Sequence, residues 1–301
     1  MKIAVLMSTY NGEEYIRQQI DSILAQQCAC EFELLVRDDG SVDGTKQILE
    51  EYREQGKLKW YCGENLGPAK SFLDLVRRSP GYDYYAFSDQ DDYWNPDKLE
   101  MAVSTLRGES ENCVYFANAQ LVDENLKSFG RTVYEKQPRT DFATVSCAGG
   151  ILGCTVVFDR YVSKLIQEKP MPDRVYMHDY FVAVLCLATG GKLAYDNRVC
   201  MRYRQHRANV LGVPHSFAGR IKNRTRLALR PEKVSVAQQA SELLNLYGDM
   251  ISLENQQWLQ KLAAYNRNLL SRAQMALSNR YHCASANMGL SIRLAFLMGN
   301  R

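Results

Sequence analysis

The sequence lacks a segment that could cross a membrane as a helix. Its longest uninterrupted apolar run, residues 181–188, is far shorter than the roughly 20 residues that span a bilayer. The apolar start of the chain, residues 1–7, is too short for the core of a signal peptide, and no cleavage site follows it. We therefore expect a cytoplasmic protein. With 46% apolar and 24% charged residues, the composition excludes disorder as the main state of the 301-residue chain.

The chain also lacks the groupings of cysteine and histidine that are typical of structural metal sites. Nine cysteines are present, an odd number, and no C-x-x-C motif occurs. The four histidines are too scattered for a metalloprotease helix. This pattern excludes a disulfide framework and favours reduced thiols, most of them buried.

Two nucleotide-binding motifs are absent as well. The chain contains neither the G-x-G-x-x-G fingerprint of dinucleotide-binding folds nor the G-x-x-x-x-G-K-[ST] phosphate loop. A phosphate bound by this protein would therefore not be cradled by a glycine-rich loop. The alternative is a divalent cation that is held by carboxylates and carries the phosphates.

Charge is distributed unevenly along the chain. Residues 201–301 contain 15 basic and 4 acidic residues, a net of +11, whereas residues 1–200 contain 22 and 30, a net of −8. The basic C-terminal region suits contact with phosphates, an anionic membrane surface or nucleic acid.

Short apolar runs alternate with helical patterns in the first third of the chain. This alternation is typical of βαβ units, so we predict an α/β fold with a mostly parallel sheet flanked by helices. The predicted strands cover residues 2–7, 31–37, 58–62 and 84–88. The predicted helices cover residues 14–25, 45–55, 69–78 and 96–106.

The pattern is less regular beyond residue 110. Strands are predicted over 114–118, 155–158, 192–195 and 198–203, and helices over 161–167 and 179–188. From residue 216 onward we predict only helices, over 217–229, 234–250, 254–278 and 284–298. We place a domain boundary near residue 213, between an α/β domain (1–213) and a basic helical region (214–301).

Polar loops follow three of the predicted strands, at residues 8–12, 38–44 and 89–92. Ligands of open α/β sheets bind outside the carboxyl ends of the strands, so these loops are expected to converge on one site. Residues 39–50 nearly fit an EF-hand calcium loop, but Ser41 departs from that pattern and the segment before it is strand-like. We therefore interpret this stretch as a tight βα turn.

Seven polar segments occur in order along the chain: Ser8-Thr9-Tyr10-Asn11-Gly12, Arg37-Asp38-Asp39-Gly40-Ser41-x-Asp43-Gly44-Thr45, Asn65-x-Gly67, Ser88-Asp89-Gln90-Asp91-Asp92-x-Trp94, Gly153-Cys154-Thr155, Met177-His178-Asp179 and Tyr203-Arg204-Gln205-His206. Together they resemble the family 2 glycosyltransferases of GT-A fold. The D-Q-D-D-x-W, H-D and Y-R-Q-H forms are most similar to the bacterial rhamnosyltransferase branch, which builds cell-surface polysaccharide. The resemblance covers about residues 1–210, and the region beyond about residue 213 has no match.

The resemblance implies a nucleoside-diphosphate-sugar donor, either dTDP-rhamnose or a UDP-hexose, and a saccharide acceptor that is lipid-linked. It further implies inversion at the anomeric carbon by a single displacement. The implied donor site comprises Ser8, Thr9, Tyr10, Asn11, Asp39, which accepts the N3–H of uracil or thymine, and Asp89 on the ribose side. The implied metal site, for Mn²⁺ or Mg²⁺, comprises Asp91 and His206, and the implied general base is Asp179.

The residue types suit this chemistry on general grounds. The leaving nucleoside diphosphate develops negative charge, which a cation at Asp91 would neutralise. A sugar hydroxyl is a poor nucleophile and needs a base on the face opposite the leaving group, a role that suits Asp179. The structural alternatives are a helix cap for Asp179, a solvated turn residue for Asp91 and a structural histidine for His206.

Further candidates have equally plain alternatives. Trp94, with Asp92 in support, is a candidate platform for the acceptor sugar or simply a core residue. Arg204, with Arg202 and Arg207, is a candidate phosphate clamp in the donor site or part of an ordinary strand edge. The basic, amphipathic segment 217–230 suits peripheral contact with a membrane. Its structural alternative is a helical cap that packs on the catalytic domain or dimerises. Residues 290–298 are a second candidate for membrane contact, or are part of the core.

Two other functions fit the sequence less well. A nucleotidyltransferase would need a glycine-rich basic loop after the first strand, and residues 8–12 contain no lysine or arginine. A nucleic-acid-binding protein would need a recognisable module in the basic tail, and none is present. We therefore expect an enzyme with no nucleic-acid partner.

Overall fold

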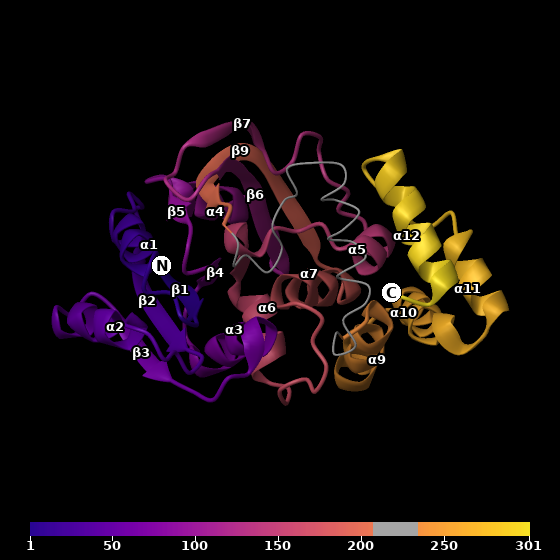
Figure 1. Cartoon of the computed structure of the whole chain (residues 1–301). Coiled ribbons are helices and arrows are strands. Elements are labelled where there is room, and N and C mark those ends of the chain that lie inside the picture. Colours follow the sequence, from indigo (N-terminus) through magenta and orange to yellow (C-terminus); the bar gives the residue numbers. More distant parts are fainter. Residues whose placement is uncertain (207–233) are drawn as a thin grey trace.

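The computed structural model describes residues 1–206 and 234–301 (Figure 1). The predicted helix over 217–229 and the predicted boundary near residue 213 lie outside these residues. The described chain forms an α/β fold in which helices flank one large sheet, as predicted. None of the described helices is long and apolar enough to span a bilayer.

The first half of the sheet is parallel. Its strands are β1 (Lys2–Thr9), β2 (Glu31–Asp38), β3 (Lys59–Cys62) and β4 (Tyr84–Ser88), in the spatial order β3-β2-β1-β4. The connecting helices are α1 (Ile16–Leu24), α2 (Thr45–Glu54) and α3 (Gly67–Arg78). All eight predicted elements of this region, α4 (Lys98–Arg107) included, are confirmed with shifts of one or two residues at most ends.

Strand β1 is buried on both faces of the sheet. Ala4 and Leu6 belong to one hydrophobic core, whereas Ile3, Val5 and Met7 belong to a second core on the other face. A strand in this position is expected to be apolar at every residue, because helices cover both sides of a parallel sheet. The continuous apolar run at the start of the sequence follows from this position.

The second half of the sheet is mixed. Its strands are β5 (Tyr93–Trp94), β6 (Cys113–Val122), β7 (Ser128–Thr132), β8 (Val157–Asp159) and β9 (Lys192–Arg204). Strand β8 runs antiparallel to both β4 and β6, β6 is parallel to β9, and the short strands β5 and β7 are antiparallel to β9 and β6. The parallel prediction therefore holds for β1–β4 and for the β6–β9 pair.

Three details differ from the predicted elements of this half. The two strands predicted over 192–203 are one strand, β9, whose register with β6 shifts after Ala117. Residue Thr155 ends a 3-10 turn, Gly153–Thr155, so only the end of the predicted strand 155–158 is extended. The structure also contains helix α5 (Phe142–Ala148), which the sequence did not predict, beside the predicted helices α6 (Arg160–Gln167) and α7 (His178–Ala188).

The described part of the C-terminal region contains only helices, as predicted. They are α9 (Val236–Tyr247), α10 (Leu253–Ala264), α11 (Leu269–Ala276) and α12 (Ala286–Met298). The single helix predicted over 254–278 was wrong, because Asn268 separates α10 from α11. The Asn268 side chain caps α11 by accepting a 2.8 Å hydrogen bond from the backbone N–H of Ser271.

These helices pack on the α/β part of the chain, with α11 and α12 outermost (Figure 1). Residues of α9, α10 and α12 share one hydrophobic core with α3 and α7. The Trp258 indole N–H donates a 2.8 Å hydrogen bond to Ser146, and the Arg301 guanidinium donates to the Cys147 carbonyl at 2.6 Å and 2.9 Å. The described tail helices therefore pack on α5 and α7, whereas segment 217–230, for which a membrane contact or a helical cap was considered, lies outside the described residues.

Candidate active site

The loops after β1 and β2 meet at the carboxyl end of the sheet. The Asn11 N–H donates to Ser41 Oγ at 2.8 Å, and the Val42 N–H donates to Asn11 Oδ1 at 2.9 Å. The Asp39 N–H also donates to the Thr9 carbonyl at 2.8 Å. Two of the predicted loops are thereby joined into one surface.

The third loop is attached to the first through Gln90. Its carboxamide oxygen accepts from Thr9 Oγ1 at 2.5 Å and from the Tyr10 N–H at 2.9 Å, and its Nε2 donates to the Tyr10 carbonyl at 3.2 Å. Gln90 therefore holds the Thr9–Tyr10 backbone against the Asp-rich loop. The sequence analysis gave Gln90 no role, because its partners lie 80 residues away.

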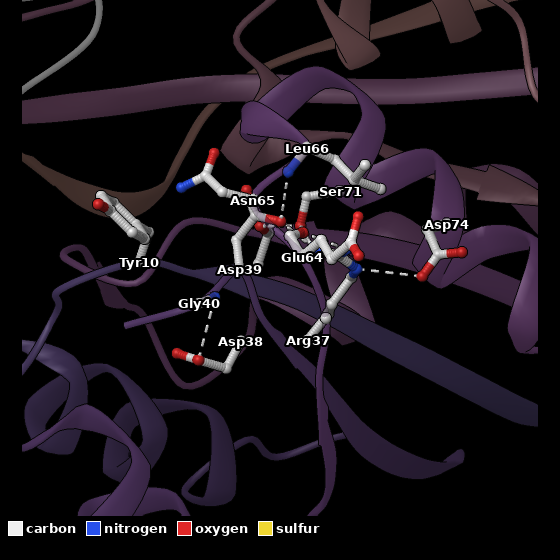
Figure 2. Close-up of polar contacts among 12 residues, drawn as sticks. Tyr10, Arg37, Asp38, Asp39, Gly40, Glu64, Asn65, Leu66, Ser71 and Asp74 are labelled. Carbon is white, nitrogen blue, oxygen red and sulfur yellow. Dashed lines mark hydrogen bonds and ion pairs between the residues drawn. The ribbon is translucent and has the colours of Figure 1, made fainter. Parts of the chain in front are cut away.

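Asp39 lies at the centre of a buried hydrogen-bond network (Figure 2). Its Oδ1 accepts from the Leu66 N–H at 3.0 Å and from Arg37, and its Oδ2 accepts from the Gly67 N–H at 2.8 Å. Both backbone donors stand at the start of α3. An ionised carboxylate offers about four acceptor positions, so within the described residues one position on Oδ2 remains for a further donor.

Arg37 positions Asp39 and was not predicted to do so. Its guanidinium also donates to Asp74 at 3.1 Å, to Ser71 Oγ at 3.1 Å and to the Glu64 carbonyl at 2.9 Å. Figure 2 shows this side chain lying between Asp39 and Asp74. The Ser71 hydroxyl is 2.5 Å from that of Ser8, which connects the predicted donor residue Ser8 to the same network. Tyr10, in contrast, is 48% exposed.

Asp91 and His206, the two metal ligands implied by the resemblance, contact each other. Asp91 Oδ2 lies 2.7 Å from His206 Nε2, and the imidazole packs against Tyr15 with ring centroids 4.9 Å apart. A carboxylate suits Mn²⁺ and Mg²⁺, and an imidazole nitrogen is a common ligand of divalent first-row metals. Neighbouring ligands that each lie about 2.1 Å from an octahedral cation are about 3 Å apart, so this spacing fits two ligands of one ion.

A second group of metal-binding residue types includes two carboxylates of the same loop. One ligand atom from each of Asp89, Asp92 and Cys154 lies within 4.8 Å of the other two. Burial raises the pKa of the Cys154 thiol well above its usual value, which keeps it protonated and makes it a poor ligand. The Asp91–His206 pair is therefore the better fit for a hard divalent cation.

Asp179 stands at the start of α7, where sequence analysis expected either a base or a helix cap. The N-cap residue is Met177, so Asp179 lies in the first helical turn, and its Oδ1 accepts from the Tyr180 N–H at 2.7 Å. Burial raises the pKa of Asp179 to about 6, although hydrogen bonds from the backbone N–H groups of Tyr180 and Gly153 lower it. The desolvation effect therefore outweighs the effect of the helix terminus.

Asp179 belongs to an acidic cluster at this edge of the sheet. Burial, and then the neighbouring charges of Asp91 and Asp179, raise the pKa of Asp89 to about 7. His178, next to Asp179, is stacked on Phe72 at 4.0 Å, and burial lowers its pKa to about 3, so it is neutral. The three carboxylates repel one another unless a proton or a cation compensates their charge.

The position of Arg204 does not fit a phosphate clamp. Its side chain is 2% exposed and donates to the Asp91 carbonyl at 2.7 Å, to Gln18 Oε1 at 2.6 Å and to the Glu124 carbonyl. It also lies over the Tyr15 ring, 4.5 Å from the centroid. Arg204 therefore fixes the backbone of the Asp-rich loop from behind instead of facing the donor.

Trp94 and Asp92 are placed in the interior and not on an acceptor surface. Trp94 is 1% exposed, and the Lys98 ammonium lies 3.8 Å from its ring centroid. Asp92 is completely buried, and its Oδ1 accepts from the Arg204 N–H at 3.1 Å. Both residues are therefore part of the core, which is the alternative considered from the sequence, and neither presents a surface to an acceptor sugar. The buried cation Lys98, which donates to the Cys154 carbonyl, was not predicted.

Comparison with known proteins agrees with this geometry. The family model described as glycosyl transferase family 2 matches residues 4–159. The dTDP-rhamnosyl transferase RfbG of Shigella flexneri is 30% identical over 236 residues, which cover 72% of this chain and 77% of the relative. The UDP-Glc:alpha-D-GlcNAc-diphosphoundecaprenol beta-1,3-glucosyltransferase WfgD of Escherichia coli is 27% identical over 209 residues, covering 69% and 79%.

A solved structure shares the fold at low sequence identity. The mannosyltransferase PcManGT from Pyrobaculum calidifontis, in complex with GDP-Man and Mn²⁺, superposes with a TM-score of 0.55 and 16% identity, over 99% of this chain and 88% of that chain. The fold is therefore that of the GT-A glycosyltransferases, as the motifs predicted. The matched family model covers more than half of the chain, and this chain belongs to glycosyl transferase family 2.

Proposed function

We propose that this glycosyltransferase is inverting and metal-dependent, and that it transfers rhamnose from a dTDP donor to a saccharide in cell-surface polysaccharide synthesis. The observation that carries the proposal is the arrangement of Asp89, Asp91 and Asp179. These carboxylates share one edge of the sheet, next to the two loops that bear Tyr10 and Asp39. A nucleotide-binding surface thus adjoins both a cation site and a candidate base.

The donor nucleoside would lie between Tyr10 and Asp39. The exposed ring of Tyr10 offers a stacking face, and the remaining acceptor position of Asp39 suits the N3–H of thymine or uracil. The name of the Shigella relative supports dTDP-rhamnose, whereas that of the Escherichia relative supports the alternative, a UDP-hexose. The two bases differ by one methyl group, worth about 1 kcal/mol on burial.

A divalent cation, Mn²⁺ or Mg²⁺, would be held by Asp91 and His206. When bound, it supplies positive charge to the diphosphate as the bond to the sugar breaks. Arg204 holds the Asp91 backbone and the Tyr15 ring packs on the His206 imidazole, so both ligands are held before a cation arrives.

Asp179 would act as the general base. With a pKa of about 6 its carboxylate is ionised at pH 7 and still basic enough to accept the proton of the attacking acceptor hydroxyl. The acceptor oxygen then bonds to the anomeric carbon while the bond from that carbon to the diphosphate oxygen breaks. The nucleoside diphosphate leaves with the bonding electrons, and the configuration inverts.

The acceptor is proposed to be a lipid-linked saccharide. The name of the Escherichia relative, which includes a diphosphoundecaprenol acceptor, supports this class. Such an acceptor would bring a cytoplasmic enzyme to the inner face of the cell membrane.

A thermal-shift panel tests the donor site. The diphosphates of thymidine, uridine, guanosine and cytidine are each added with Mn²⁺ and with EDTA. We expect thymidine or uridine diphosphate to raise the melting temperature, and EDTA to abolish the shift, because a ligand of the folded state stabilises it by mass action. No shift with any of the four would overturn the proposed donor site.

A further inference from the structure

Helix α12 is apolar on two opposite faces, of which only one is covered. Ile292 and Phe296 are buried against the rest of the chain, whereas Leu290, Leu294 and Leu297 are 60%, 47% and 45% exposed. The exposed residues recur at intervals of four and three, so they form one stripe along the helix. A helix that is apolar all round is normally buried all round. The exposed stripe therefore needs a partner beyond the described residues.

Helix α11 packs beside α12 and carries further exposed leucines. It runs antiparallel to α12. Arg293 donates to the carbonyls of Ala276 and Ser278 at the end of α11, whereas Gly299, which follows α12, lies beside Asn266, which precedes α11. Exposed leucines occur at both of its ends. We define the leucine face as Leu269, Leu270, Leu277, Leu290, Leu294 and Leu297, each of which is at least 45% exposed.

The charge of the region that carries the leucine face is mostly of one sign, and its acidic residue Glu254 pairs with Arg280. Residues 255–301 contain six basic residues and no acidic residue. Arg293 and Arg301 donate to backbone carbonyls, whereas Lys261 and Arg267 are exposed. A second copy of the chain would bring these cations against one another, which disfavours self-association through this face. An anionic partner would be attracted instead.

We propose that the leucine face rests in the interface of an anionic lipid bilayer, with Lys261 and Arg267 at the level of the lipid headgroups. Exposed leucines beside cations on outward helices are the pattern by which peripheral helices bind such surfaces. The sequence analysis expected this contact over 217–230, which lies outside the described residues, with 290–298 as a second candidate, and the structure adds the exposed leucines of α11. The lipid-linked acceptor of the proposed function would explain the contact, but bilayer binding does not require that function.

The test is sedimentation of the full-length chain with vesicles that contain no acceptor. Vesicles of phosphatidylcholine alone are compared with vesicles that also contain phosphatidylglycerol. The test variant is Leu294→Gln with Leu297→Gln. The control is Leu253→Gln, since Leu253 is 76% exposed at the start of α10, outside the leucine face.

We expect the wild type to bind the anionic vesicles more tightly than the neutral ones, and the double variant to lose at least tenfold in affinity while the control is unchanged. The variant Lys261→Glu with Arg267→Glu should lose the preference for anionic vesicles. Nucleotide-induced thermal shifts should be the same in all four proteins, which separates this proposal from the donor site. Wild-type-like vesicle binding by the leucine double variant would overturn the proposal. An equal loss of vesicle affinity in the Leu253→Gln control would do the same. So would dimerisation of the wild type that the leucine double variant abolishes.

Discussion

Gly12 lies directly against the side chain of Gln90. A Cβ on Gly12 would come within 2.6 Å of Gln90 Cδ, closer than any real side-chain contact. The glycine thus allows Gln90 to bond both Thr9 and Tyr10, so the loop proposed to bind the nucleoside is held by the loop proposed to bind the cation. The glycine of the first motif is explained by this contact and not by its backbone angles.

Replacing Gln90 by alanine should weaken nucleotide binding. The variant loses the bonds that hold the Thr9–Tyr10 backbone, so we expect about a tenfold rise in the donor KM with a smaller change in kcat. Gln90→Glu keeps the acceptor for the Tyr10 N–H and should recover part of the loss. A lower melting temperature with unchanged donor affinity would contradict the positioning role.

Gly12→Ala should reproduce this effect by a different route. The new methyl group would displace the Gln90 carboxamide, so donor affinity should fall by a similar factor. The two substitutions remove the same contact, and their effects should not add in the double variant Gly12→Ala, Gln90→Ala. Additive losses of affinity, measured by calorimetry, would show that Gly12 matters for another reason.

The cation dependence of nucleotide binding should be lost when Asp91 is replaced. In Asp91→Asn the side chain keeps its shape but not its charge, so Mn²⁺ should no longer increase the affinity for the nucleoside diphosphate. Affinity measured with EDTA should stay close to that of the wild type. An equal Mn²⁺ effect in the variant would direct attention to Asp89 and Asp92 as the ligands.

Turnover should decrease as the pH falls through about 6. Burial raises the pKa of Asp179 to about 6, and only the ionised carboxylate can accept the acceptor proton. Below that pH, kcat should fall toward a tenfold loss per pH unit, and above it this group should impose no further change. A pH–rate profile that is flat between pH 5 and 7 would contradict this assignment.

The contact between Trp258 and Ser146 should contribute to stability and not to catalysis. Trp258→Phe removes the indole N–H that donates to Ser146 and leaves an aromatic ring in the core. We expect a loss of about 1 kcal/mol in the free energy of unfolding, measured by urea denaturation. Ser146→Ala is the matched variant, because it removes the hydroxyl oxygen that accepts this hydrogen bond. Unchanged stability in both would show that the tail packs independently of this bond.

The elements predicted correctly are those whose burial produces a regular pattern of apolar residues in the sequence. Strands β1 to β4 lie between helices, so their apolar runs are visible without the structure. Strand β7, Ser128–Thr132, is largely exposed and has no such pattern. Helix α5 is short, although Asp141, which caps it by accepting from the Thr144 N–H at 2.9 Å, was a signal that could have revealed it. Asn268 was a similar signal for the break before α11.

The convergence of the three polar loops was predicted from the sequence, but the buried contacts that support these loops were not. The order of strands brings the three polar loops together, which sequence spacing and topology rules anticipate. Whether an arginine or a tryptophan next to such a loop faces the ligand or the interior is decided by contacts distant in sequence. The Arg204 guanidinium donates to the Glu124 carbonyl. The Lys98 ammonium lies over the Trp94 ring and donates to the Cys154 carbonyl. Such pairings have no local signature.

The most direct test of the mechanism compares donor binding with turnover in Asp179→Asn. Donor affinity is measured by calorimetry with Mn²⁺, and turnover as release of nucleoside diphosphate with a lipid-linked saccharide extract as acceptor. Our account predicts wild-type donor affinity and a loss of turnover of at least a thousandfold, because the base is removed while the nucleotide site is intact. Loss of donor binding together with turnover would contradict the account, since Asp179 would then belong to the donor site and the general base would be another residue.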